Sequence, residues 1–498
     1  MDRRRFLRAA AFGGAALALT RPALAAALDD PVARFAQGLA RHPWLAGWQD
    51  APLFDATPRR LDVVGRVPDG LRGSLYRNGP GRFSRAGFRY QHWFDGDGLL
   101  QAWQIGADGI SHRARFVGTR KFQREEAAGR FLLPAAGTRV PGAVAIRNSD
   151  DLNVANTAVL QHAGALYALW EGGSAYAIDA DTLLARGPKT WREDLGSVPF
   201  SAHPLHERDG SLWNFGLLDR TLVIWQLDGA GAVRRVQPVE LPFAGYLHAF
   251  SMTERYLVFV LLPYVRDGAL DGRAYFEAMR WQPERGCRAL VVDKADLERR
   301  RWYGLPAGAA YHYGLAYQHG RELVLHACWN RDGAATISPF RAELQGRPQR
   351  VDSGASLERI TLHLDQGHAR MDTLIRGAID FPAWDEGTST TRMFALSGAE
   401  RSESGYFDAI SAIDGERGQV DRYVFGPGCM VEEHRFVPAA GRERPQQGWL
   451  VGCVLDYRRG RSGISIFDAE QLGAGPLAQA WLPHSLPLGF HGWFQPSA

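Results

Sequence analysis

Short apolar runs alternate with turn sequences over most of the chain. Runs rich in β-branched and aromatic residues, each bounded by Gly, Asp, Asn or Pro, predict β-strands at residues 165–171, 256–264, 287–293, 321–329, 359–365 and 448–457. Asp-Gly pairs mark tight turns at residues 69–70, 95–96, 97–98, 209–210, 228–229, 267–268, 332–333 and 414–415. Long helical periodicity is scarce outside residues 29–41. The pattern therefore predicts an all-β fold.

Two stretches repeat one order of strand, turn, strand, Asp and Leu. They read "LYALWEGGSAYAIDADTLLARG" and "VGCVLDYRRGRSGISIFDAEQL". Repeated meanders over roughly 450 residues favour radial closure into a β-propeller, which leaves few exposed strand edges. The copies are too divergent to give the number of blades. Residues 128–145 are apolar, contain Gly and Pro, break this rhythm and predict a long loop.

The first 27 residues have the pattern of a signal peptide. Arginines open the chain, an uncharged run covers Ala9 to Thr20, and small residues follow at 23–25. The run is shorter than the ~20 residues that span a bilayer. The order R-R-x-F-L resembles a twin-arginine signal, and an Arg-rich general secretory signal is the alternative. We expect export to the periplasm and a single propeller domain over residues 28–498.

Composition and charge narrow the class of protein. The 498 residues are 45% hydrophobic and 22% charged with a formal net charge of +4, and no basic run follows the N-terminus. We therefore expect no nucleic-acid partner.

The chain has four cysteines and no C-x-x-C pair, so the sequence does not predict a disulfide framework. We expect the cysteines to be buried free thiols.

Four of the fifteen histidines share a setting of small and aromatic neighbours without adjacent charge. They are His203 in "PFSAHPL", His248 in "GYLHAFSMT", His312 in "AAYHYGLAY" and His491 in "GFHGWF". Separations of 45, 64 and 179 residues exclude presentation by one helix or hairpin. A propeller can gather them, because the inner strand of every blade ends near one axis. Four imidazoles suit iron, copper, nickel or zinc. The alternative for each is a core histidine bonded to a backbone carbonyl.

Several motifs in order resemble the carotenoid cleavage oxygenases over nearly the whole mature chain. They are "LYRNGPGRF" (75–83), "HWFDGDGLL" (92–100), "ANTAVLQHAGALYALWEGGSAYAID" (155–179), "SAHP", "LHAFSMT", "FVP" (436–438) and "LPLGFHGWF". The resemblance implies a seven-bladed β-propeller with an apolar loop and helix cap over an axial metal site. It also implies Fe(2+) as the metal, with His203, His248, His312 and His491 as its ligands.

The resemblance further implies acids that accept the second N–H of the ligand imidazoles. Glu171 and Glu433 match such acids, and ordinary turn or surface acids are the alternative. Asp380 departs from the family, which usually has Glu there. The shorter side chain requires a backbone that lies closer, a bridging water, or an imidazole that is held less firmly.

Two further features of the sequence concern the surroundings of the expected metal. Thr157 matches a threonine that crowds an open iron position in some relatives. His312 is followed by Leu315 and Gln318, where the family usually has Asn and later an acid, so the local support of this ligand differs.

We expect a structural role for Arg77, Asn78 and Gly79, and for the Asp-Gly-Asp-Gly sequence at 95–98. The latter lacks the remaining ligands of a calcium loop.

The implied reaction is oxidative cleavage of a conjugated C=C bond by O2 into two carbonyl products, without an organic cofactor. A carotenoid or apocarotenoid is one substrate, and a lignin-derived hydroxystilbene is the alternative, with Tyr90 and Lys121 as candidates to hold its phenol. A propeller that binds an apolar ligand without turnover is a third hypothesis.

The loop at 131–145 would form the mouth of an apolar tunnel through which substrate reaches the axis, or would contact a membrane, with simple loop packing as the alternative. We expect a monomer or a small homo-oligomer.

Overall fold

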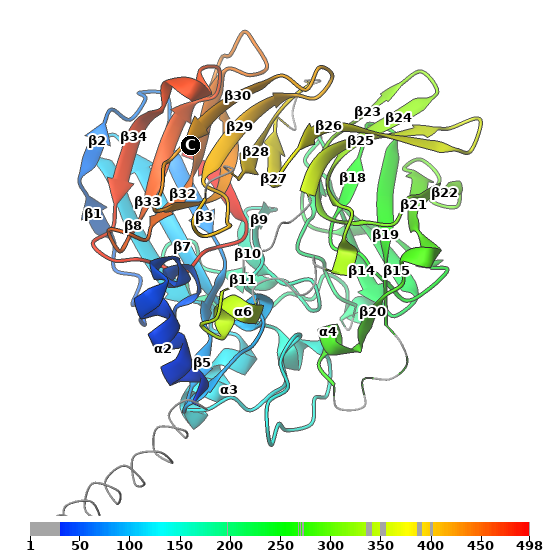
Figure 1. Ribbon diagram of the computed structural model, residues 1–498. Helices are drawn as coiled ribbons and strands as arrows, with labels where there is room; N and C mark the ends of the chain where they lie inside the picture. Colours follow the sequence, from blue (N-terminus) through cyan, green and yellow to red (C-terminus); the bar gives the residue numbers. More distant parts are fainter. Residues whose placement is uncertain are drawn as a thin grey trace, which may run out of the picture.

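The computed structural model describes residues 30–497, except residues 197, 267, 269, 271, 272, 335–340, 349–354, 386–390 and 399–401. The predicted signal segment, residues 1–27, lies outside the described residues. Antiparallel sheets surround a common centre, and the labelled helices gather toward one end of the molecule (Figure 1). No helix in the described part of the chain has the length and apolar character needed to cross a membrane.

Seven sheets of four or more strands among the described residues form the blades. Blade 1 contains β1 (Arg59–Leu61), β3 (Gly73–Arg77), β4 (Pro80–Arg82), β7 (Asp97–Gly106), β8 (Gly109–Phe116) and β35 (Gly492–Pro496). Blade 2 contains β9 (Ala158–His162), β10 (Ala165–Leu169), β11 (Tyr176–Ile178) and β12 (Ala185–Pro188). Blade 3 contains β13 (Leu205–His206), β14 (Leu212–Leu218), β15 (Thr221–Leu227) and β16 (Val233–Glu240).

The remaining blades follow in chain order. Blade 4 contains β17 (Gly245–Tyr246), β18 (Phe250–Met252), β19 (Tyr256–Arg266), β20 (Met279–Trp281), β21 (Cys287–Asp293) and β22 (Arg300–Leu305). Blade 5 contains β23 (Ala309–His319), β24 (Glu322–Asn330), β25 (Ala355–His363) and β26 (Ala369–Arg376). Blade 6 contains β27 (Ile379–Trp384), β28 (Arg392–Ser397), β29 (Ala409–Asp414) and β30 (Val420–Val424). Blade 7 contains β31 (Cys429–Pro438), β32 (Gly448–Asp456), β33 (Arg461–Asp468), β34 (Pro476–Trp481) and β2 (Val63–Gly65). The seven-bladed propeller prediction is confirmed.

Both ends of the propeller sequence close the ring. The C-terminal strand β35 pairs with β3 of blade 1, and the N-terminal strand β2 pairs with β34 of blade 7. On the first seam, Leu75 lies opposite Phe494 on one side and Trp103 on the other. Closure removes two sheet edges that would otherwise expose unpaired backbone groups.

The helices belong to a cap at one end of the ring. Within the described ranges the α-helices are α2 (Pro31–Arg41), α3 (Arg120–Ala128), α4 (Tyr275–Ala278) and α6 (Arg341–Leu344). The short 3-10 turns in these ranges are η1 (Pro43–Trp48), η2 (Trp93–Asp95), η3 (Ser149–Leu152), η4 (Glu193–Leu195), η5 (Pro283–Arg285) and η6 (Leu472–Ala474). Asp30 caps α2 by accepting from Val32 N, and Thr119 caps α3 by accepting from Phe122 N. The α2 helix agrees with the helical periodicity in the sequence.

The apolar segment after α3 has no helix or strand up to residue 148, as its composition predicts. Two buried carboxylates hold it in place. Glu125 Oε1 accepts from the backbone N–H of Leu132 and Leu133, at 2.9 and 3.0 Å. Asp95 accepts from Gly137 N at 2.8 Å and from the Thr138 hydroxyl at 2.5 Å. The segment is therefore a fixed part of the cap.

Apolar side chains fill the space between neighbouring blades. Alternate residues of β8 are buried, as expected for a strand that packs mainly on one face. Between blades 1 and 7, Leu75 and Trp103 pack in one cluster with Ile464 and Ala480. Each fully buried aliphatic side chain contributes about 1.5–3 kcal/mol to folding, so this seam is a principal source of stability for ring closure.

We predict that Leu75→Ala lowers the free energy of unfolding by about 2–5 kcal/mol, because it removes buried methyl groups and leaves a cavity. Leu75 is 0% exposed, whereas Leu53 is 62% exposed, so Leu53→Ala is the matched control and should change stability by about 0.5 kcal/mol or less. Chemical denaturation measures both variants. Equal effects would contradict the assignment of this seam.

Candidate metal centre

The four singled-out histidines converge on the propeller axis. His203 lies just before β13, His248 lies between β17 and β18, His312 lies on β23, and His491 immediately precedes β35. One ring nitrogen from each lies within 4.8 Å of the others. Nε2 of His203 is 2.9 Å from Nε2 of His248, and Nε2 of His312 is 3.1 Å from Nε2 of His491. Blades 3, 4, 5 and 1 each supply one imidazole.

Irregular backbone directs the His312 side chain toward the axis. The pairing of β23 with β24 shifts register between Ala310 and Tyr313, and again between Tyr313 and Ala316. His312 lies in the first of these breaks. A bulge bends a strand and re-aims a side chain that regular pairing would place on a sheet face. The histidine therefore points inward because the ladder is interrupted at its own position.

Three of the four imidazoles donate Nδ1–H to a carboxylate. The pairs are His248 with Glu171 at 2.6 Å, His312 with Asp380 at 2.7 Å, and His491 with Glu433 at 3.0 Å. Glu171 follows β10, Asp380 lies on β27, and Glu433 lies on β31. Among the described residues, no acid forms a hydrogen bond with the ring of His203. An ionised carboxylate only accepts, so each partner Nδ1 carries the proton.

This protonation pattern leaves a lone pair on Nε2 of the three supported imidazoles. The Nε2 atoms of His312 and His491 are 3.1 Å apart, and two lone pairs at that distance repel. A shared cation converts the repulsion into coordination. Four neutral imidazole nitrogens form a donor set that suits a divalent first-row transition metal. The residues therefore fit a metal ion.

Burial favours the neutral form that coordination needs at two of the four imidazoles, those of His203 and His491. It lowers the pKa of His203 well below its ordinary value, with neighbouring imidazoles adding to the effect. Burial also lowers the pKa of His491 to about 4, although the Glu433 carboxylate opposes this shift. Burial would raise the pKa of Glu433, but His491, Arg435 and Arg77 together lower it below its usual range. Glu433 is thus ionised and His491 is neutral at pH 7.

Asp380 reaches His312 directly despite its short side chain. Pairing of β27 with β28 shifts register between Asp380 and Ala383, and Phe381 has a φ of 54°. The Asp380 Oδ1 atom accepts both from His312 Nδ1 and from Phe381 N at 2.8 Å. A left-handed conformation is unusual for a bulky residue and marks local strain. The irregular backbone brings the carboxylate close enough that no bridging water is required.

Thr157 lies beside the cluster. Its backbone carbonyl accepts from His491 N at 3.1 Å, and its own N–H donates to Leu169 O at 2.9 Å. The hydroxyl donates to Asn156 Oδ1 at 3.1 Å. Thr157 thereby joins blade 2 to the segment that carries His491. The predicted crowding of an open metal position stays a prediction.

An apolar cavity of about 550 Å³ reaches the cluster. His248, His312 and His491 form part of its wall, with Thr157 beside them. The wall also contains many aromatic residues, among them Trp93, Phe94, Tyr246, Phe276, Tyr311, Phe381, Phe407 and Phe490. Residues 134–136 of the predicted loop line it too. The site can therefore hold a flat, apolar molecule beside the metal position.

Sequence reasoning missed two polar groups that support the acids. The Tyr246 hydroxyl donates to Glu171, at 3.0 Å from Oε1 and 3.2 Å from Oε2. Arg77, interpreted from sequence only as structural, donates to Glu433 Oε2 at 2.9 Å. Tyr246 precedes His248 by two residues, but a tyrosine in an apolar strand carries no signal of its own. Arg77 lies in a recognisable motif, and its partner is 356 residues away.

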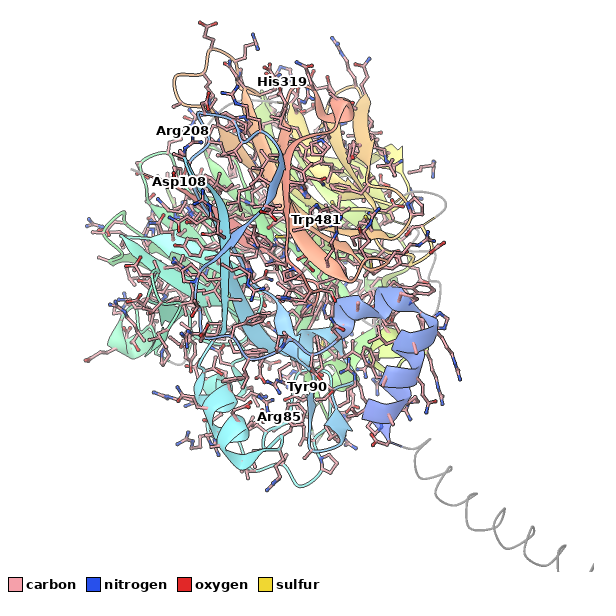
Figure 2. The ribbon with its side chains drawn as sticks, turned by 90° about the vertical axis from the view of Figure 1, so that its left-hand side faces the viewer. Arg85, Tyr90, Asp108, Arg208, His319 and Trp481 are labelled. Carbon is pink, nitrogen blue, oxygen red and sulfur yellow. The ribbon has the colours of Figure 1, made fainter. Side chains whose placement is uncertain are left out.

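Tyr90 and Lys121 contact one another, but neither lines the cavity. Lys121 Nζ lies 2.6 Å from the Tyr90 hydroxyl and 2.6 Å from Glu125 Oε2. Asp97 Oδ1 is 3.8 Å from the same nitrogen. Figure 2 shows Tyr90 and Arg85 at the helix-bearing end of the molecule. The pair therefore belongs to a buried ion cluster in the cap, and the hypothesis that it holds a substrate phenol is not supported by the geometry.

The Asp-Gly-Asp-Gly turn serves the cap and not an ion. Asp95 holds Gly137 and Thr138, as described above, whereas Asp97 Oδ2 accepts from Arg85 at 2.7 Å. Gly98 permits a close approach, since a Cβ atom there would lie 2.4 Å from Ala155 O. The two carboxylates point to separate partners, as expected for a structural turn.

The family model for retinal pigment epithelial membrane protein matches residues 51–496. The chain belongs to this family, which confirms the resemblance. The Synechocystis apocarotenoid-15,15'-oxygenase is 27% identical, covering 91% of this chain and 96% of the relative. The Pseudomonas putida isoeugenol monooxygenase is 25% identical, covering 91% and 98%. The Pisum sativum carotenoid 9,10(9',10')-cleavage dioxygenase 1 is 27% identical, covering 91% and 90%. These relatives are oxygenases, in agreement with the predicted enzyme class of carotenoid-cleavage-type dioxygenases.

Solved structures show the same fold. A cobalt-substituted Synechocystis apocarotenoid oxygenase superposes with a TM-score of 0.82 at 24% identity, covering 91% of this chain and 98% of that structure. A chimera that combines parts of the Synechocystis oxygenase and the retinal pigment epithelial protein gives a TM-score of 0.82 at 23% identity, with the same coverage. At this level of identity the likeness establishes the propeller.

We predict that Lys121→Met lowers the free energy of unfolding by about 3–5 kcal/mol, because the buried Glu125 loses its ion pair at 2.6 Å and is left with the longer one to Arg85, at 3.8 Å. Metal content per folded chain should stay unchanged, since Lys121 lies outside the cavity. Lys189→Met, at a partly exposed lysine, is the control and should change stability by about 0.5 kcal/mol or less. Denaturation and metal analysis measure the two effects. A stable Lys121→Met variant with impaired metal content would contradict this assignment.

Proposed function

We propose that the chain is a non-haem iron(II) dioxygenase that cleaves a conjugated C=C bond of a carotenoid or apocarotenoid into two carbonyl products. One observation carries the proposal: a cluster of four imidazoles presents its three carboxylate-supported members in the wall of a cavity rich in aromatic residues. The relatives named for cleavage of carotenoids and apocarotenoids cover about nine-tenths of the chain.

The choice of iron(II) follows from the donor set and the family. Four neutral nitrogens leave the full charge of a divalent ion in place. Imidazole is a suitable ligand for iron(II), although affinity alone rises from iron through cobalt and nickel to copper, so the family relationship decides for iron. The cobalt-substituted structural neighbour supports a divalent site in this fold. When bound, ferrous iron would supply the one-electron chemistry that lets triplet dioxygen react with a closed-shell alkene.

The reaction balances without a reductant. The C=C bond is broken, each of its carbons gains one oxygen atom of O2, and two aldehydes or ketones leave. The chain itself contributes position and exclusion of water. Its aromatic cavity holds a conjugated bond beside the imidazoles, and positioning of this kind lowers the entropic part of the barrier. The Nδ1–H bonds to Glu171, Asp380 and Glu433 keep the imidazole rings in one orientation.

A shorter phenolic alkene is the second candidate substrate. Isoeugenol monooxygenases of two Pseudomonas species are relatives of 24–25% identity over about nine-tenths of this chain. This observation favours a phenylpropenoid or a hydroxystilbene. The burial of Tyr90 and Lys121 away from the cavity favours the apocarotenoid instead. The two substrates are separable by the assay below.

We also propose that the cavity mouth contacts a membrane surface. Val144, Ile146 and Leu218 are 40%, 43% and 40% exposed, and Ile146 and Leu218 line the cavity. Arg147 lies beside Ile146 and is mostly exposed, and cations favour an anionic headgroup layer. A carotenoid dissolved in lipid would then pass directly into the cavity. We propose too that residues 1–27 act as a signal peptide that directs export to the periplasm.

We predict that His248→Ala reduces bound iron from about one per chain to below about 0.1, because the variant removes one ligand together with its hydrogen bond to Glu171. The test reconstitutes the purified protein anaerobically with ferrous iron, admits air, and follows the absorbance of an apocarotenal and of a hydroxystilbene. Loss with one substrate identifies its class. His319→Ala is the control, because His319 is exposed at the other end of the propeller (Figure 2).

Two results would contradict the proposal. Full iron occupancy in His248→Ala would refute the ligand assignment. Full iron occupancy in the unaltered protein, with neither substrate consumed, would favour the alternative of a propeller that binds an apolar ligand without turnover.

We predict that the double variant Val144→Ser and Ile146→Ser binds anionic vesicles about tenfold more weakly, because two apolar side chains no longer enter the lipid. Vesicle flotation measures the bound fraction. The matched control is Val420→Ser with Val424→Ser on β30, the last strand of blade 6, where two exposed valines do not line the cavity. An equal loss in both double variants would contradict contact at the mouth.

A further inference from the structure

Two consecutive acids, Glu432 and Glu433, hold the segment that carries His491. Glu432 Oε2 accepts from Gly489 N at 2.6 Å, and Glu433 Oε2 accepts from Gly492 N at 2.7 Å. Glu433 Oε1 accepts from His491 Nδ1 at 3.0 Å. The two carboxylates therefore bind the backbone on both sides of the histidine as well as its ring.

Regular strand geometry would not allow this arrangement, because consecutive side chains of a strand point to opposite faces. The pairing of β31 with β32 shifts register between Val431 and His434, and both acids lie inside that break. A bulge of this kind reorients side chains. Both carboxylates consequently face the same segment.

Arg77 joins the two acids. Its Nη1 donates to Glu433 Oε2 at 2.9 Å and its Nη2 donates to Glu432 Oε2 at 3.0 Å. All three side chains are at most 4% exposed. The planar guanidinium presents its donors in a fixed fork, which a lysine cannot reproduce. A buried charge without such a partner is strongly unfavourable.

The residue after Arg77 holds the same segment from the other side. Asn78 N donates to His491 O at 3.0 Å, and Phe490 N donates to Asn78 O at 2.8 Å. Gly79 lies so close to Gly489 that a Cβ atom would be 2.4 Å from its Cα. The Arg-Asn-Gly sequence of the first blade is thus built around the last ligand.

We propose that Arg77 and Glu432 are positioning residues that fix His491 as the fourth metal ligand, so that metal binding is coupled to closure of β35 onto blade 1. The inference rests on the proposed metal site. Neither residue contacts the Nε2 atoms that face the axis. Both act through Glu433 and through the backbone of residues 489–492. Because metal binds only the closed arrangement, it stabilises the fold by a free energy that increases with the logarithm of its affinity.

The test titrates the metal-depleted full chain with Co²⁺, followed by its visible absorption, and measures melting temperature with and without Co²⁺. The variants are Arg77→Lys, which keeps the charge but loses the fork, and Glu432→Gln, which keeps the shape. We expect each to weaken Co²⁺ binding about 10–100-fold, the usual effect of losing a partner outside the ligand set. The stabilisation by Co²⁺ should shrink accordingly.

Arg85→Lys is the matched control, since Arg85 is also buried and paired with an acid, Asp97, but lies in the cap. It should lower the melting temperature of both forms by the same amount and leave Co²⁺ affinity within about threefold. If Arg77→Lys does not fold, Glu432→Gln decides. Folded variants with unaltered Co²⁺ affinity and an unaltered Co²⁺-dependent shift would overturn the inference. Failure of the unaltered protein to bind Co²⁺ would instead refute the proposed metal site.

Discussion

The orientation of three Nδ1–H groups toward carboxylates determines the rest of the centre. Because Glu171, Asp380 and Glu433 accept the Nδ1 protons, the unprotonated nitrogen of each of these rings is Nε2, and its lone pair points toward the axis. The Nε2 lone pairs of His312 and His491, 3.1 Å apart, repel one another, and a divalent cation between them removes that repulsion. The acids thus select the tautomer of the three rings that they contact and the sign of the charge that the site accepts.

Delivery of those rings depends on the closed ring of blades. Each ligand comes from a different blade, so no part of the chain could assemble the cluster alone. Backbone irregularities in β23, β27 and β31 supply His312, Asp380 and Glu433. Regular ladders build the blades, and their interruptions aim the functional side chains inward. The C-terminal strand completes both the first sheet and the ligand set.

Much of this architecture could be predicted from sequence. Strand alternation and turn pairs predicted the all-β class, and small and aromatic neighbours separated the four histidines from the other eleven. The number of blades required the family resemblance, because the repeats have diverged. The Arg77 fork and the Tyr246 hydroxyl were not predictable, since their partners lie 356 and 75 residues away. Tyr90 and Lys121 were candidates by sequence position alone, and position in the sequence does not show whether a side chain lines the cavity.

Asp380 illustrates the limit of residue-by-residue comparison. A missing methylene suggested a weakened contact, yet the bulge at Phe381 brings the carboxylate to 2.7 Å from His312.

The most direct test of the whole account is anomalous diffraction at the iron edge from crystals of the reconstituted protein. The account predicts one peak about 2.1 Å from Nε2 of His203, His248, His312 and His491. A peak elsewhere, or one bound by a carboxylate oxygen of Glu171 in place of an imidazole, would contradict it.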